Sequence, residues 1–292
     1  MANARQVKQR ISTATNIAKI TKAMEMVSAS KMRKAQEQTL AARPFAVALR
    51  DSLRKVARET AQDIHPLLSQ HNEGLDVAVI ISTDRGLCGS LNQSIFKSVM
   101  LWQKSHPEGI AIVIGKKGIA FSKLFGLPVF AQFTAFPDNI TLEHVLPVVS
   151  LIVENYSEKK FRSVTVFYMD FINTLSQKLK QLELLPITEV DVLTNDAAET
   201  PALDLPKEFT FEPNAKEILA ELLPYYIENN IFQSFLESKA SEHSARMVSM
   251  KNASENAKDL VKELRLIYNK SRQESITSEL LDITTATLSL AD

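Results

Sequence analysis

Residues 225–292 read YYIENNIFQSFLESKASEHSARMVSMKNASENAKDLVKELRLIYNKSRQESITSELLDITTATLSLAD. This stretch of 68 residues contains neither glycine nor proline, the two residues that interrupt helices most strongly. A helix of that length spans roughly 100 Å, at about 1.5 Å per residue, which is much longer than a helix that wraps around a small domain. The C-terminal segment is therefore predicted to form one long helix.

The N-terminal segment has the same character. All seven glycines lie between Gly74 and Gly126, and ten of the eleven prolines lie between Pro66 and Pro224. Only Pro44 interrupts the first 65 residues. A second long helix is expected there, because glycine and proline are the strongest local breakers.

Apolar residues recur at spacings of three and four in both segments, which is the pattern of a coiled-coil seam. In the N-terminal segment they form two sets: Val7, Ile11, Ala14 and Ala18, and Ile17, Ile20, Met24 and Val27. In the C-terminal segment they are Ala253, Ala257, Leu260, Leu264 and Ile267, and after a slip of phase Ile276, Leu280 and Ile283. The slip predicts a local change of supercoil. Because the first helix ends where the middle of the chain begins and the last helix starts where it finishes, the two are predicted to pair antiparallel.

The middle of the chain alternates strand and helix signals, as in βαβ units. Strands are expected at Leu75–Ser82, Ile110–Ile114 and Val164–Tyr168, and helices from about Asn92, at 116–125 and at 142–156. The predicted fold is α/β: an antiparallel two-helix coiled coil from the two ends of the chain, plus a small Rossmann-like domain with a parallel sheet. The predicted boundaries are 1–60 for the first helix, 73–190 for the α/β domain, 191–212 for an acidic connector and 213–292 for the last helix.

Charge is balanced overall but unevenly distributed. Lys and Arg number 34, as do Asp and Glu, whereas residues 1–58 hold thirteen basic against three acidic residues. Such an excess on a helix favours a polyanionic partner, either DNA or a ring of acidic protein loops. Residues 1–44 contain no aromatic side chain, which argues against single-stranded nucleic acid, since it binds by stacking. No apolar run approaches the roughly 18 residues of a membrane-spanning helix.

Two glycine-containing turns are the candidate chemical sites. Ser82–Asn92 (STDRGLCGSLN) follows a predicted strand and precedes a helix, where phosphate sites often lie, but it lacks both glycine-rich nucleotide motifs. The turn Gly115-Lys116-Lys117-Gly118 is interpreted as structural in the same way. Cys88, the only cysteine, and the five histidines show no catalytic or metal-ligand spacing. No catalytic, cofactor or metal site is therefore predicted.

Three segments carry a specific resemblance. Residues 20–35 (ITKAMEMVSASKMRKA), 245–260 (ARMVSMKNASENAKDL) and 268–277 (YNKSRQESIT) resemble the signature helices of the gamma subunit of bacterial-type rotary F-type ATP synthases. The turn at 82–92 resembles that family's turn, and the likeness covers essentially the whole chain. Because it already begins near Arg5, the acid-free opening MANARQVKQRISTAT is not expected to be a transit peptide.

The resemblance implies a non-catalytic rotor shaft inside a hexamer of alternating alpha and beta subunits. It implies a globular domain that joins the epsilon subunit and sits on the membrane ring of c subunits, with no cofactor and no nucleic acid. The chain would then be a peripheral protein at the cytoplasmic face of the bacterial inner membrane, with membrane contact only through its partners. The residues expected to face the hexamer are Lys19, Lys22, Met24, Lys31, Arg33, Arg246, Arg272, Gln273 and Thr277. The foot on the c ring is expected at Phe209, Phe211 and Glu212.

Two departures from the family pattern and two alternative functions accompany this hypothesis. Ser90 stands where the family usually has glycine, and the plant-type regulatory dithiol insertion is missing. One alternative is an enzyme that uses the α/β domain as a nucleotide site. The other is a basic coiled-coil protein that binds nucleic acid or acts as an adaptor, for which a steep salt dependence of binding would be the sign.

Overall fold

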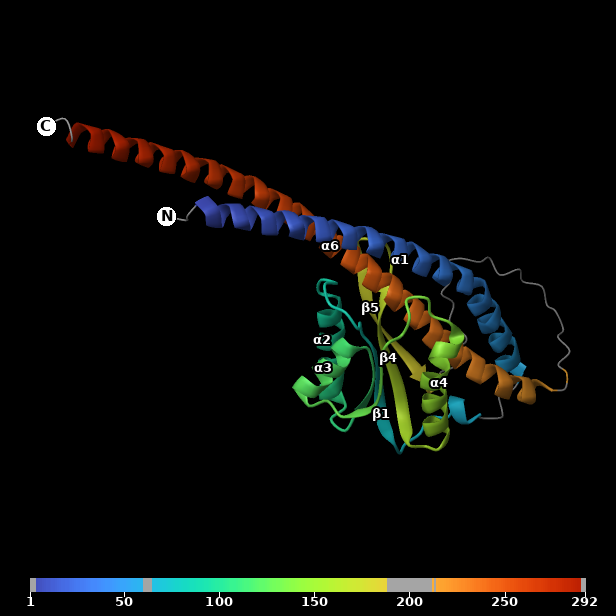
Figure 1. Cartoon of the computed structure of the whole chain (residues 1–292). Coiled ribbons are helices and arrows are strands. Elements are labelled where there is room, and N and C mark those ends of the chain that lie inside the picture. Colours follow the sequence, from blue (N-terminus) through green and yellow to red (C-terminus); the bar gives the residue numbers. More distant parts are fainter. Residues whose placement is uncertain (1–3, 60–64, 188–211, 213, 290–292) are drawn as a thin grey trace. The chain divides into compact units, whose positions relative to one another are not determined.

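Two long helices dominate the computed structural model, which describes residues 4–59, 65–187, 212 and 214–289 (Figure 1). Helix α1 runs from Ala4 to Glu59 and helix α6 from Ala215 to Ser289. The chain divides into two compact units. Residues up to 29 and from 246 onward form one, here called the shaft unit, and residues 30–245 form the other, the globular unit. No described helix is both long and apolar enough to cross a membrane.

The two helices of the shaft unit meet along one narrow stripe. Its buried members are Val7, Ala14, Ala18 and Ser28 on α1, and Met250, Ser254, Ala257 and Leu264 on α6. The Ser254 hydroxyl donates a hydrogen bond to the Ala18 carbonyl (3.3 Å), while Val7 and Ala14 pack with Leu264. Residue numbers therefore decrease along α6 as they increase along α1, so the two helices run antiparallel. The predicted antiparallel pairing is confirmed.

The register of the predicted seam was partly wrong. The Val7 to Ala18 set is on the seam, but Ile17, Ile20 and Val27 of the second set are 48–60% exposed. Adjacent residues on a helix point about 100° apart, so Ile17 faces outward when Ala18 faces α6.

The predicted C-terminal seam has the same kind of error. Leu260 and Ile267 are 48% and 51% exposed, because the stripe passes through Val261 and Tyr268 instead. Residues 272–285 are exposed throughout, including Ile276, Leu280 and Ile283, where α6 continues past the start of α1 (Figure 1).

The globular unit is built on a five-stranded sheet with the order β3-β2-β1-β4-β5. The strands are β1 (Leu75–Ile81), β2 (Ile110–Ile114), β3 (Val129–Phe133), β4 (Phe161–Phe171) and β5 (Gln177–Leu185). The first four in this order are parallel, whereas β5 is antiparallel to β4. The predicted strands are present, and the two edge strands β3 and β5 are additional to them.

Helices cover both faces of the sheet (Figure 1). Helices α2 (Leu91–Ser105) and α3 (Lys116–Phe125) pack on one face, over Ala78, Ile80 and Val113. On the other face lie α4 (Leu142–Ser157), the short helix η1 (Pro66–Leu68) and, within the globular unit, parts of α1 and α6. Strand residues alternate between the two cores, as expected for a parallel sheet buried on both sides.

Helix α6 starts with a reciprocal cap. The Asn214 side chain accepts a hydrogen bond from the Glu217 amide (2.9 Å) and donates one to the Glu217 carboxylate (2.7 Å). Such a cap satisfies donors that the first turn of a helix leaves open. The predicted last segment, 213–292, begins close to this cap, while nearly all of the acidic connector lies outside the described residues. The four predicted segment boundaries stay predictions.

Candidate functional site

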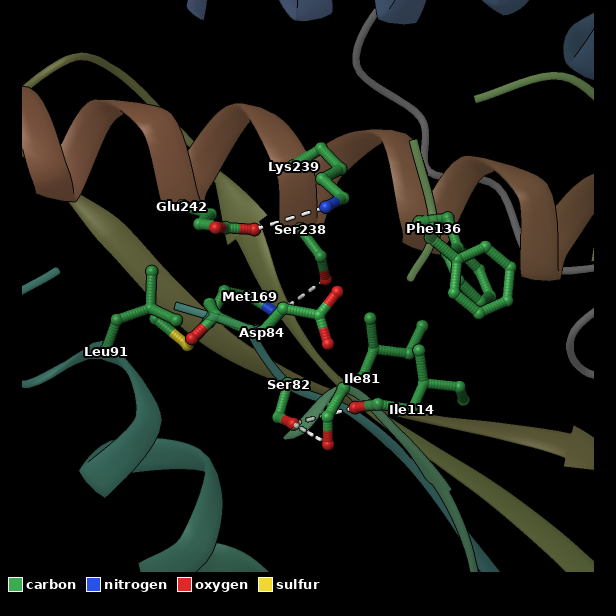
Figure 2. A pocket seen from close by; sticks show the side chains of 13 residues that line it. Ile81, Ser82, Asp84, Leu91, Ile114, Phe136, Met169, Ser238, Lys239 and Glu242 are labelled. Atoms are coloured by element: carbon green, nitrogen blue, oxygen red, sulfur yellow. Dashed lines mark hydrogen bonds and ion pairs between the residues drawn. The ribbon is translucent and has the colours of Figure 1, made fainter. Parts of the chain in front are cut away.

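The crevice at the carboxyl ends of β1 and β4 is where a doubly wound sheet would bind a nucleotide. Here it is closed by α6, as Figure 2 shows. Ser82 and Asp84 line it from the end of β1, Met169 from β4, and Phe235 and Ser238 from α6. The remaining cavity is about 20 Å³, which is room for about one water molecule. The crevice therefore has no space for a nucleotide.

Two serines of α6 complete the hydrogen bonding of β4. The pairing of β1 with β4 ends at Ile80 and Phe167. Beyond that point the Met169 amide donates to the Ser238 hydroxyl (3.4 Å), and the Ser241 hydroxyl donates to the Met169 carbonyl (3.0 Å). The backbone amide and carbonyl of Met169 have no partner on β1, so these two hydrogen bonds satisfy them and fix α6 to the end of β4.

The N-terminus of α3 is occupied by the chain itself. The amides of residues 116–118 donate to the Asp84 carboxylate (3.0 Å), the Thr83 carbonyl (3.0 Å) and the Ser82 hydroxyl (2.8 Å). These are donors that would otherwise attract a phosphate. The structural interpretation of the turn at 115–118 is therefore the one that the geometry supports.

Glycine is required at the start of this turn for a steric reason. Gly115 has φ +94°, and a Cβ built on it would lie 2.3 Å from the Ser82 carbonyl oxygen. A Cβ at Gly118 would lie 2.7 Å from the Ser82 hydroxyl. The close approach of β1 and α3 thus accounts for both glycines without a ligand.

The turn between β1 and α2 is also satisfied internally. The Asn92 amide group donates to the Thr83 hydroxyl (2.8 Å) and to the Cys88 sulfur (3.4 Å), and the Thr83 hydroxyl donates to the Arg85 carbonyl (2.7 Å). Cys88 is buried, so its thiol is poorly placed to act as a nucleophile. Ser90 has φ −86°, a value open to any residue, so its difference from the family's glycine needs no backbone compensation.

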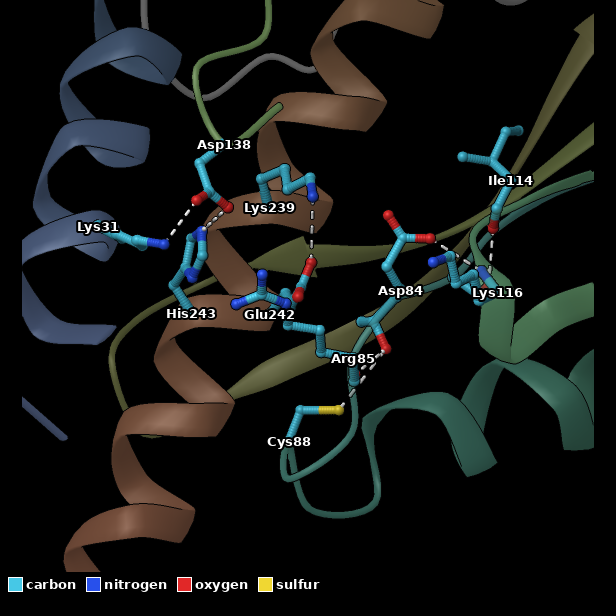
Figure 3. A network of polar contacts seen from close by, with 12 residues as sticks. Lys31, Asp84, Arg85, Cys88, Ile114, Lys116, Asp138, Lys239, Glu242 and His243 are labelled. Carbon is cyan, nitrogen blue, oxygen red and sulfur yellow. Dashed lines mark hydrogen bonds and ion pairs between the residues drawn. The ribbon is translucent and has the colours of Figure 1, made fainter. Parts of the chain in front are cut away.

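A polar cluster in the globular unit joins three segments that are distant in the sequence (Figure 3). Asp138, in the loop between β3 and α4, accepts a hydrogen bond from Lys31 of α1 (2.6 Å). Its other carboxylate oxygen lies 3.3 Å from Nε2 of His243 on α6. Lys239 and Glu242 of α6 form a further ion pair beside it (3.5 Å). The sequence did not point to Asp138 or His243 as important residues.

Comparison with known proteins agrees with the geometry. A family model described as "ATP synthase" matches residues 3–290. The chain is 39% identical over 292 residues to the "ATP synthase gamma chain" of Methylacidiphilum infernorum, covering 98% of each chain. The chain belongs to the ATP synthase gamma family. It is 37% identical to the gamma chain of Legionella pneumophila, over 97% of this chain and 98% of that one.

Solved structures show the same fold for this gamma chain. A chain from the Euglena gracilis mitochondrial ATP synthase rotor matches with a TM-score of 0.63 at 20% identity, covering 94% of this chain and 98% of its own. A chain from the Tetrahymena thermophila central stalk and c ring matches with a TM-score of 0.61 at 24% identity, covering 80% of this chain and 99% of its own. Membership of the family makes this chain an ATP synthase gamma subunit, a non-catalytic subunit of the complex, and favours this function over both alternatives.

The gamma residues predicted to face the hexamer on α1 differ in exposure. Lys19, Lys22 and Arg33 are exposed, and Met24 is half-buried. Lys22 pairs with Glu25 (2.9 Å), and Lys31 is the partner of Asp138. Lys22 and Lys31 therefore each have an ion-pair partner within the chain, and the contacts of all these residues with the hexamer stay predictions.

The predicted residues on α6 also fall into two groups. Arg246 is buried, whereas Arg272, Gln273 and Thr277 are exposed on the part of α6 that continues past the start of α1. Of the predicted foot, Glu212 is exposed, and Phe209 and Phe211 lie outside the described residues. The far part of α6 is therefore exposed, and both its contacts with the hexamer and the foot stay predictions.

One surface was missed by the sequence reasoning. Exposed apolar side chains of α1 form an outward face of the shaft unit, here called the apolar face: Ile17, Ile20 and Val27, 48–60% exposed. All three were counted in a spacing of three and four that was interpreted as the seam. The sequence signal that distinguishes this exposed face from the seam is the neighbouring set of small residues, because a two-stranded coiled coil buries only one stripe of each helix.

Proposed function

We propose that this gamma chain is the rotor shaft that couples rotation of the membrane c ring to the conformational cycle of the catalytic beta subunits, in synthesis and hydrolysis of ATP, and thereby regulates proton flow. Its partners in this proposal are the alpha and beta subunits of the hexamer, the epsilon subunit and the c ring. The chain acts at the cytoplasmic face of the bacterial inner membrane and touches the membrane through its partners.

The observation that carries the proposal is the asymmetry of the shaft unit. A shaft that made equal contacts with three catalytic sites would shift none of their equilibria. Here α1 presents the cations Lys19 and Lys22 and the apolar face, whereas α6 continues alone with Arg272 and Thr277 exposed. Each angular position of the rod therefore offers a different surface.

The size of the required effect shows that several residues must act together. Moving one site from 1:99 to 99:1 between open and closed forms needs roughly 5.5 kcal/mol of differential interaction. One exposed ion pair supplies about 0.2–1 kcal/mol. We infer that Lys19, Lys22 and Arg33 act collectively on acidic beta-subunit loops, while Met24 and the apolar face add steric contact. Lys31 was predicted to belong to this group, but it already pairs with Asp138 within the chain.

The similarity to chains of solved rotor structures supports the c ring and the epsilon subunit as partners of the globular unit and the foot. One matching structure is of a mitochondrial central stalk and c ring, and another of an F1 and c-ring assembly. In this proposal the segment with Phe209, Phe211 and Glu212 is the foot on the c ring, and the globular unit receives epsilon.

The test is the threefold variant with Lys19, Lys22 and Arg33 changed to Gln, assembled with the other ATP synthase subunits. ATP-driven proton pumping per ATP hydrolysed is expected to fall, and the loss is expected to vary with ionic strength because screening acts on charges. A matched control changes three exposed lysines of the globular unit, Lys97, Lys104 and Lys123, to Gln. Pumping by the first variant equal to that of the control would contradict the proposal.

A further inference from the structure

The loop between β3 and α4 is held firmly on both sides of Asp138. Before it, the Phe136 ring packs on Phe235 of α6, with 4.8 Å between ring centroids. After it, Ile140 is 2% exposed within the main core, and Thr141 caps α4 together with His144. Asp138 therefore projects from a short segment whose two ends have little freedom to move.

From this loop, neighbouring side chains reach two turns of α1. Asp138 accepts the hydrogen bond from Lys31 (2.6 Å), and Asn139 accepts one from Gln38. Lys31 and Gln38 are seven residues apart, so they lie on the same face of the helix. The loop thus contacts α1 along its length rather than at a single point.

The same carboxylate also meets α6. Its Oδ1 lies 3.3 Å from Nε2 of His243, whose side chain is 4% exposed (Figure 3). Burial alone would raise the pKa of Asp138, but the hydrogen bond from Lys31 and the charges of His243, Lys31 and Lys239 lower it below its ordinary value. Asp138 is therefore a carboxylate at neutral pH, with a cation or imidazole from each long helix beside it.

The two helices depend on this contact to different degrees. Helix α6 has its own anchors beside it, in Phe235 of the core and in the serine bonds to β4. Helix α1 buries Met32 and Ala35 beside Lys31, but it enters the main core fully only at Leu49, Leu53 and Val56, several turns further along the chain. Among the contacts of α1 near Lys31, the hydrogen bond to Asp138 is thus one that leads directly to a loop anchored in the core.

We propose that Asp138 is a positioning residue that ties α1 to α6 inside the globular unit, so that both helices carry torsional load together. The inference rests on the proposed rotor function. It assigns Lys31 a role within the chain, through Asp138, rather than a contact with the beta subunits.

The test is Asp138→Ala in the complete ATP synthase, with two readouts. Uncoupled ATP hydrolysis, where the shaft turns against little load, is expected to stay within about twofold of the wild type, as for a surface substitution. ATP-driven pumping against an imposed proton gradient is expected to fall by about fivefold, since both charge contacts are lost. Equal proportional losses in the two readouts would indicate a merely structural role and overturn the proposal.

A double-mutant cycle that combines Asp138→Ala with Lys31→Met shows whether Lys31 acts through Asp138 or on another chain. If Lys31 acts through Asp138, the double variant pumps as well as Asp138→Ala alone, because the contact is already gone. Additive losses would mean that Lys31 acts on another chain, and would overturn the proposal. Lys31→Met by itself, at a half-buried helix position, is expected to lower pumping against the gradient more weakly than Asp138→Ala and to leave uncoupled hydrolysis nearly unchanged. This variant keeps the test usable even if Asp138→Ala assembles poorly.

Glu158→Gln serves as the matched control. Glu158 is also a carboxylate of the globular unit, and it forms an ion pair with Lys160 (2.6 Å) on the surface. The substitution removes its charge. Both readouts are expected to equal those of the wild type. If the wild-type chain itself neither assembles nor pumps, the rotor function fails. If the wild type pumps and Asp138→Ala pumps equally well against the gradient, the proposed role of Asp138 is wrong, while the proposed rotor function stands.

Discussion

The shaft unit and the globular unit bury their apolar residues in opposite ways. Ile80 and Ile112 of the sheet are fully buried, with helices on both sides. The stripe of the shaft unit consists largely of small residues such as Ala14 and Ala257, and larger residues such as Ile20 point outward. The globular unit therefore carries its own core, whereas the shaft unit buries little apolar surface between its helices and leaves its larger side chains exposed.

The largest effect that tests this difference in burial is expected for Ile112→Ala. Ile112 is 0% exposed, so its truncation removes buried methyl groups and leaves a cavity that costs about 2–5 kcal/mol. Urea unfolding of the full chain, followed by near-UV circular dichroism, measures the loss. Ile20→Ala, at a 60% exposed position of α1, is the control and should change the free energy of unfolding by less than about 0.5 kcal/mol. Equal losses would mean that the two regions do not differ as described.

A smaller effect is expected for Ala18→Leu on the seam. Ala18 is 8% exposed, and its carbonyl accepts the bond from Ser254. A larger side chain there forces the helices apart, at a cost of about 1–3 kcal/mol. Hydrogen exchange should become faster in residues 4–29 and 246–271, with no change in the sheet. Ala23→Leu, the same substitution at an exposed position of α1, should leave exchange unaltered.

The smallest effect is a pH dependence inside the globular unit. Glu237 of α6 accepts a hydrogen bond from Gln233 (2.8 Å). Burial, and then the nearby charge of Asp170, raise its pKa above the ordinary 4.5, despite opposing contributions from Gln233 and Lys180. A carboxyl group with a raised pKa stabilises the fold while protonated, and that stability is lost as pH rises through the folded-state pKa.

Glu237→Gln is therefore expected to raise the free energy of unfolding at pH 8 and to make little difference near pH 4. Urea titrations at the two pH values measure this. Glu221→Gln, at an exposed position of the same helix, provides the baseline. A gain for Glu237→Gln that is the same at both pH values would show that the effect is not one of protonation.

The long helices were predictable because the absence of glycine and proline from the chain ends is a local property. Their register was not, because Ile17 and Ala18 both fit a spacing of three and four, and only the partner helix decides which one is buried. Strand β5 escaped prediction because Gln177, Lys178 and Lys180 give it the composition of a solvent-facing segment. It forms because β4 offers it an antiparallel edge.

The features of the candidate site divide in the same way. The cations of α1 and the turns at the ends of β1 and β2 were visible as local runs of sequence. Asp138 lies 107 residues from Lys31, and no local pattern joins them. Nor does the sequence show that Ser238 and Ser241 close the crevice, since that depends on where α6 crosses the sheet.

The exposed far part of α6 has a consequence for how the protein is made. Beyond Ser271 every residue up to 285 is exposed, and a single unsupported helix of this length is only marginally stable in water. In the proposed rotor, the tip is therefore expected to complete its folding only when the hexamer surrounds it. In the isolated chain, Lys270 and Arg272 lie on this marginally stable helix, so a trypsin-like protease is expected to cut there first.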